Sequence, residues 1–153
     1  MAALADEYYT SSVSYEIHEV KVEPWETNLT ALFDKNNLKW KDLIENGTPL
    51  PTPWNKEKFD KFGYSVQKER DSLRAAMVPE EVMEDLFTRQ MNQEDGYFAV
   101  EQYREKVGAF EGAGYLARGL YRPQIDCIMY TSHLQFCKVC RRSIENLIYQ
   151  YVK

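Results

Sequence analysis

The sequence has 153 residues, a length that suits one globular domain, and its hydrophobic content of 44% is that of a chain able to form a core. The formal net charge is −5 at pH 7, and no basic run is rich enough to bind phosphate backbones, which argues against a nucleic-acid partner. No stretch of about 18 apolar residues is present, so we expect no membrane span. We expect residues 1–153 to form a single domain.

The N-terminal third is predicted to contain an extended segment, a short helix and a proline-rich segment. Residues 11–23 are β-branched and partly alternating, which predicts extended structure. A short helix is indicated before Asn46-Gly47 by four apolar residues: Leu38, Trp40, Leu43 and Ile44. Residues 48–53 carry prolines at alternate positions, which excludes a helix there.

Two helices are predicted in the middle of the chain. Residues 56–76 are charged and helical in character, although Gly63 interrupts the pattern. Pro79 suits the first turn of the next helix, and the two glutamates after it complement the positive end of the helix dipole. This second helix should end near Gly96. Its largely apolar face consists of Val82, Met83, Leu86, Phe87, Gln90 and Met91.

The C-terminal third begins with a cluster of glycines and ends in a predicted helix. The glycines are Gly108, Gly112, Gly114 and Gly119. Their spacing matches neither the GxxxxGK[ST] nor the GxGxxG phosphate-binding pattern, so we expect a structured loop with tight backbone turns. An amphipathic helix at the end of the chain is predicted from residues at helical spacing: Cys140, Ile144, Leu147, Ile148 and Tyr151.

Few catalytic patterns are compatible with the sequence, because it contains only two histidines. His18-Glu19 begins like the HExxH zinc motif, but Val22 stands where the second histidine would be. No GxSxG nucleophile elbow is present either.

The three cysteines lie close together near the C-terminus. With His133 they form a C-x5-H-x3-C-x2-C pattern, which offers enough soft ligands for a tetrahedral structural zinc. A disulfide between Cys127 and either Cys137 or Cys140 is the competing interpretation, and it leaves one thiol unpaired. A redox centre at the Cys137–Cys140 pair is a third, although no βαβ pattern of thioredoxin type precedes it.

Several short strings, taken in order, resemble the immunoglobulin-A peptidase family of zinc metalloendopeptidases. They are LADEY at 4–8, TPLPTP at 48–53, VGAFEGAGY at 107–115, GLYRP at 119–123, DCIM at 126–129 and FCKVC at 136–140. Their order matches the family from end to end, so the resemblance covers essentially the whole chain. It implies an α+β fold, mostly helical with long loops, that forms the C-terminal portion of a zincin-type, metzincin-like metallopeptidase domain.

The resemblance also implies roles for individual residues. In the family, the LADEY string follows an HExxH helix whose histidines bind zinc and whose glutamate is the general base. Asp6 would then be the third zinc ligand, with the fourth position left for water. Met129 would form the Met-turn beneath the metal, and Glu111 and Tyr121 would line the cleft.

The HExxH motif itself is missing from this sequence. We therefore expect the chain to be the C-terminal half of a catalytic domain, without the active-site helix, and to bind no catalytic zinc and cleave no protein by itself. The surface against which the missing helix would pack, here called its seat, would be exposed. Self-association through this surface is therefore expected. The implied substrates are proteins or glycoproteins.

The family also implies a location for the parent protein. Its members are typically exported, which places the parent in an extracellular or periplasmic setting, although this chain shows no signal peptide. Export favours a disulfide among Cys127, Cys137 and Cys140 over a structural metal. Two other functions stay open: a non-catalytic module that binds protein or glycan, and a small domain stabilised by structural zinc.

Overall fold

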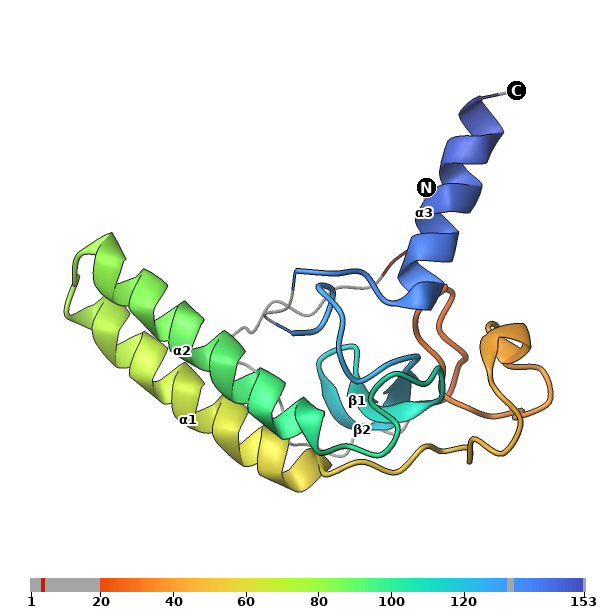
Figure 1. The fold of residues 1–153 in the computed structure, drawn as a ribbon, viewed down its shortest axis with the longest axis horizontal. Helices are drawn as coiled ribbons and strands as arrows, with labels where there is room; N and C mark the ends of the chain where they lie inside the picture. The colour runs from red at the N-terminus through yellow and green to blue at the C-terminus, as the bar shows by residue number, and fades with distance from the viewer. Residues whose placement is uncertain (1–3, 5–19, 132–133, 153) are drawn as a thin grey trace.

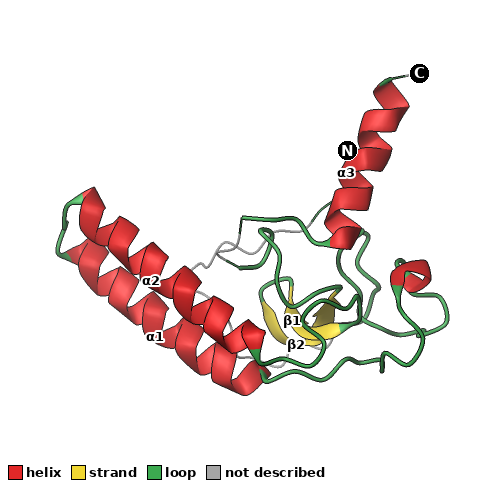
Figure 2. Cartoon of the chain, viewed as in Figure 1, coloured by secondary structure: helices red, strands yellow, loops and turns green. Residues whose placement is uncertain are grey.

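The computed structural model describes residues 4, 20–131 and 134–152 (Figures 1 and 2). Its elements, in order, are a short 3-10 helix η1 (Lys41–Leu43), α1 (Lys56–Ala75), α2 (Glu80–Ala99), β1 (Phe110–Ala113), β2 (Leu116–Arg122) and α3 (Lys138–Tyr151). This is the expected α+β fold, mostly helical with long loops. In the part of the chain described, no helix combines the length and apolar character needed to cross a membrane.

The irregular N-terminal third was predicted in part. Of the segment predicted as extended, residues 11–19 lie outside the described residues, and residues 20–23 form no strand. The short helix predicted before Asn46 is present as η1. The proline-rich segment at 48–53 contains no helix, as expected.

The helices α1 and α2 form a helical hairpin that extends to one side of the molecule (Figure 1). A buried apolar cluster of Val66, Met83 and Leu86 joins the two helices. Buried polar groups lie in the same interface: Arg70 Nη2 donates to Gln90 Oε1 at 3.3 Å, and Gln90 Nε2 donates to Glu94 Oε1 at 2.7 Å. These bonds satisfy groups that would be costly to bury unpaired.

Two details of the predicted helices were wrong. Gly63 does not interrupt α1 but lies buried within it, because one glycine weakens a helix by only about 1 kcal/mol. The buried face of α2 is also rotated from the predicted one. Val82 and Phe87 are exposed, whereas Glu94 and Phe98 are buried, because helical spacing from Met83 leads to those positions.

A bulged β-hairpin replaces the structured loop that the glycine cluster predicted (Figure 2). Gly114 and Tyr115 connect the paired residues Ala113 and Leu116, and both have positive φ angles, 61° and 62°. A two-residue type I′ turn requires positive φ at both positions, and its twist matches that of the strands. Gly112, with φ of 100°, lies where the strand register shifts. Here the glycines let a short strand bend and reverse.

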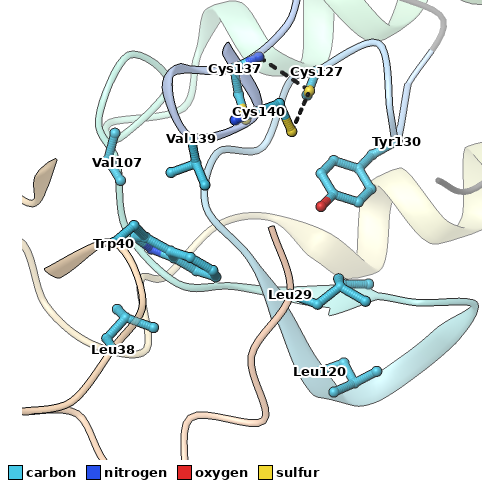
Figure 3. Packing of buried hydrophobic residues seen from close by; sticks show 11 residues of the cluster. Leu29, Leu38, Trp40, Val107, Leu120, Cys127, Tyr130, Cys137, Val139 and Cys140 are labelled. Atoms are coloured by element: carbon cyan, nitrogen blue, oxygen red, sulfur yellow. Dashed lines mark hydrogen bonds between the residues drawn. The ribbon is translucent and has the colours of Figure 1, made fainter. Parts of the chain in front are cut away.

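The main core lies between the hairpin and the loops around it (Figure 3). Trp40 is fully buried, and its indole Nε1 donates to Gly108 O at 2.7 Å. The other buried members of this cluster are Leu29, Leu38, Val107, Ala113, Leu120, Cys127, Tyr130, Cys137, Val139 and Cys140. A second cluster, Phe59, Phe98, Phe110 and Ile125, joins the hairpin to the helices. Several of the aromatic side chains therefore fill the interior.

Gly108 is a position where an added methyl group should destabilise the fold. A Cβ atom there would overlap Thr52 Oγ1 and lie 2.9 Å from Thr52 Cβ. That hydroxyl accepts a hydrogen bond from Ala109 N at 2.9 Å and donates one to Pro49 O at 2.7 Å, so it is not free to move away. We expect Gly108→Ala to lower the free energy of unfolding by about 2 kcal/mol, as measured by chemical denaturation.

Gly96→Ala is the matched control. A Cβ atom at Gly96 meets nothing within 4 Å, and the residue lies within α2. The same substitution should therefore stabilise the protein, by up to about 1 kcal/mol. Equal unfolding free energies for the two variants would contradict the packing described at Gly108.

Candidate functional site

Some of the predicted site residues lie outside the described part of the chain. These are Asp6, the predicted third zinc ligand, and both histidines, His18 and His133. Met129, Glu111, Tyr121 and the three cysteines are described.

Met129 lies in a tight turn. The turn closes through two hydrogen bonds to one carbonyl: Tyr130 N and Thr131 N donate to Cys127 O at 2.8 and 2.9 Å. The Thr131 hydroxyl reinforces it by donating to Asp126 Oδ1 at 2.8 Å. A turn is therefore present at the predicted position, while the role of Met129 beneath a metal stays a prediction.

The same turn is attached to the main core. Tyr130 is buried, and its hydroxyl donates to Asn28 O at 2.7 Å, across 102 residues of sequence. Met129 is half-buried and packs against the main cluster. Leu4, the first residue of the LADEY string, packs against that cluster as well. Two of the strings that resembled the family therefore meet at one core.

The three cysteines converge at the N-terminal end of α3 (Figure 3). Cys137 is the N-cap residue of the helix, Cys140 lies in its first turn, and Cys127 approaches from the turn that holds Met129. All three are buried, and their sulfur atoms lie within 4.8 Å of one another. The structure holds all three as thiols, so the disulfide stays a prediction.

Hydrogen bonding separates the acidities of the three thiols. Hydrogen bonds with the side chains of Cys137 and Cys140, together with backbone amides, lower the pKa of Cys127. The hydrogen bond with Cys127 raises the pKa of Cys137, and bonds with both partners raise the pKa of Cys140.

The two residues predicted to line the cleft are partners in the hairpin. Glu111 on β1 pairs with Tyr121 on β2, so their side chains lie on the same face of the sheet. The Glu111 side chain accepts a hydrogen bond from Gly119 N at 3.2 Å, and its carbonyl accepts one from Trp54 Nε1 at 3.1 Å. Burial, and to a smaller extent the negative charge of Glu111, raises the pKa of Tyr121.

Glu111 also lines a surface cavity of about 510 Å³ between the hairpin and α1. The other lining residues are Lys56, Glu57, Asp60, Lys61, Tyr64, Ala117 and Arg118. Tyr121 is not among the described residues that line it. The cavity wall carries both signs of charge, which suits a polar ligand.

Arg122 is a buried residue that the sequence reasoning missed. Its guanidinium carbon lies 5.1 Å from the ring centre of Trp54, 5.4 Å from that of Tyr130 and 5.8 Å from that of Phe59. These distances allow cation–π attraction. Its Nε and Nη2 atoms make no hydrogen bond within the described structure. Arginine is rarely buried without a partner. The signal in the sequence that could have singled out Arg122 was its place in the GLYRP string.

Comparison of the sequence with models of known protein families identifies the family. The family model for IgA peptidase M64 matches residues 1–148, nearly the whole chain. The chain belongs to the IgA peptidase M64 family. The resemblance seen in the short strings is thereby confirmed, and the family is one of metallopeptidases. A comparison with curated proteins found no match.

Membership of the M64 family implies a catalytic metal, but the residues of this sequence do not fit one. The sequence contains no HExxH motif. Asp6 alone would supply one oxygen donor, whereas a catalytic zinc site in proteins takes three protein ligands. Among the described residues, the group of three possible ligands that lie together is the cysteine cluster. Three sulfur ligands in a buried core are not the donor set of the predicted catalytic site.

The raised pKa of Tyr121 predicts how stability depends on pH. Because the folded state favours the neutral phenol, this residue contributes stability below its unfolded pKa of about 10 and loses that contribution as pH rises through the folded pKa. We expect Tyr121→Phe to unfold with a weaker pH dependence above pH ~10 than the wild type, measured by urea denaturation. Tyr149→Phe, at an exposed tyrosine, is the control and should behave like wild type. Parallel pH profiles for wild type and Tyr121→Phe would contradict this assignment.

Proposed function

We propose that this chain supplies the C-terminal half of the catalytic domain of a secreted zinc metalloendopeptidase that hydrolyses proteins or glycoproteins. The observation that carries the proposal is the M64 family match over residues 1–148. The metal site would need Asp6 together with the two histidines of an HExxH motif, which the sequence does not contain. We therefore expect no peptidase activity from the 153 residues alone.

In this proposal, Met129 forms the floor of the site. Its support is the closed turn at Cys127 and the buried Tyr130, which together fix the backbone on both sides of Met129. Leu4 packs against the same core two residues before Asp6. Leu4 and Met129, which come from two of the strings that resemble the family, thus pack against one core.

Glu111 and Tyr121 are proposed to line the substrate cleft, Glu111 in the wall of the cavity of about 510 Å³ and Tyr121 opposite it in the hairpin. The wall next to Glu111 is formed by charged residues of α1 and β2, among them Lys56, Asp60 and Arg118. An extended polypeptide offers backbone donors and acceptors along its length, and a wall of mixed charge can pair with both. This composition supports a polar segment of a protein as the substrate.

The test of activity begins with the DNA upstream of Met1, read in frame. We expect an HExxH motif a few codons before Leu4, and a protein extended to include it should cleave a protein substrate in a chelator-sensitive manner. Asp6→Ala should abolish that activity. Asp85→Ala, which changes an exposed aspartate of α2, should leave it intact.

The 153-residue chain is the negative control of the same assay. Chelator-sensitive proteolysis by this chain alone would contradict the assignment of its residues to only part of the site. An extended protein that contains HExxH but cleaves nothing, and that binds protein or glycan saturably, would favour the non-catalytic binding module instead.

Self-association is the second part of the proposal, and we place it at the exposed end of α3 rather than at the surface left by the missing helix, which the sequence predicted. Only Val139 and Cys140 of this helix are buried, while Ile148 and Tyr151 on its predicted apolar face are exposed. Such a face is normally covered by a partner. We expect the molecular mass in sedimentation equilibrium to rise with protein concentration, and Ile148→Glu to keep the protein monomeric.

Val100→Glu provides the control for self-association. It introduces the same charge at an exposed apolar residue that is not part of α3. This variant should associate like the wild type. A wild-type protein that stays monomeric at every concentration would end the self-association proposal.

A further inference from the structure

Two sulfur atoms of the cysteine cluster have the separation of ligands on one metal ion, and the third lies close to both. Cys127 Sγ and Cys140 Sγ lie 3.8 Å apart, and Cys137 Sγ lies within 4.8 Å of both. Two sulfurs bound to one tetrahedral zinc, each at about 2.3 Å, are about 3.8 Å from each other. A disulfide would require about 2.05 Å.

Backbone amides already point at two of these sulfurs. Cys137 N donates to Cys127 Sγ at 3.2 Å, and Cys140 N donates to Cys137 Sγ at 3.5 Å (Figure 3 shows the first). Such bonds orient metal ligands and stabilise negative charge on sulfur. The positive end of the α3 dipole acts in the same direction, because Cys137 and Cys140 lie at its N-terminal end.

The cluster occupies a place where a cross-link would matter for the fold. Only two residues of α3 are buried, and one of them is Cys140. Polar contacts add to its attachment: Lys138 N donates to the side chain of Gln124, and the hydroxyls of Thr27 and Ser143 lie 2.8 Å apart. A bound ion would join the start of α3 to the turn at Cys127 from within the core.

We propose that Cys127, Cys137 and Cys140 bind a structural zinc ion through their thiolates. Three S–H bonds are lost, three Zn–S bonds form and three protons pass to the solvent, while one water of the hydrated ion stays as the fourth ligand. No oxidation state changes. Soft thiolate ligands in tetrahedral geometry select zinc among the common divalent ions. This proposal does not rest on the proposed peptidase function.

The first measurement is the metal and thiol content of the full 153-residue chain, produced with zinc and purified without reductant or chelator. Elemental analysis should give about one zinc per chain, as expected for one site with high affinity. After denaturation with chelator, all three cysteines should react with a thiol reagent. Cobalt in place of zinc should give the charge-transfer absorption of thiolate ligands and the visible bands of a tetrahedral ion.

Variants locate the ion. Cys140→Ser and Cys127→Ser should each lose the bound zinc. Val139→Ala removes a buried side chain from the same helical turn without removing a ligand, so it should retain the zinc even though it is less stable. Asp6→Ala should also retain the zinc, which separates this site from the predicted catalytic ligand.

Three outcomes would overturn the proposal. One titratable thiol and no zinc would establish a disulfide. Three titratable thiols with neither zinc nor cobalt binding would mean that the cysteines only fill the core, as buried free cysteines often do. Zinc that is kept by both cysteine variants and lost in Asp6→Ala would belong to another site. None of these results bears on peptidase activity of the extended protein, so the two proposals fail separately.

Discussion

The backbone at Gly108 and Ala109 is the point on which the arrangement of the other segments depends. Trp40 Nε1 donates to Gly108 O, Gly108 N donates to Pro123 O, and Thr52 bonds to both the amide and the carbonyl of Ala109. Each bond joins segments distant in sequence and contributes about 1 kcal/mol, while leaving any one of these buried groups unpaired would cost more. The backbones approach so closely that no side chain fits at Gly108. One glycine thus allows three loops to share a single anchor.

This anchor determines where the candidate site residues lie. The strand β1 begins directly after Ala109, so the position of Glu111 follows from it, and the hairpin register then places Tyr121 opposite. The chain leaves β2 at Arg122 and passes Pro123, which is held by Gly108, before it reaches the turn at Cys127. The proposed floor at Met129 and the proposed cleft are therefore both positioned by the same few buried hydrogen bonds. The protruding helices α1 and α2 are held to this region by the Phe59, Phe98 and Phe110 cluster.

The sequence was most informative where the structure is local. The helix α2 follows from Pro79 and the acidic residues after it, and α3 follows from its apolar spacing, because capping and periodicity act within a few residues. The hairpin could not be predicted in this way. A four-residue strand is too short to show alternation, and the glycines that shape its bulge and turn read equally well as a loop. Arg122 was missed for a related reason, since the rings around it belong to residues 54–59 and to Tyr130, which only the fold brings together.

The arrangement of the cysteines could not be predicted from the sequence either. The cysteines also connect two parts of the candidate site, the cluster of sulfur atoms and the turn that holds Met129. The spacing of Cys127, Cys137 and Cys140 indicated that they act together, but only the fold brings their sulfurs within 4.8 Å of one another. Cys127 belongs both to the cysteine cluster and to the turn that holds Met129. Its sulfur belongs to the cluster, while its carbonyl closes the turn that holds Met129. Because both groups belong to one residue, restraining its sulfur limits the freedom of the backbone that closes the turn. An ion at the cluster would therefore stabilise the backbone around Met129 without touching the substrate.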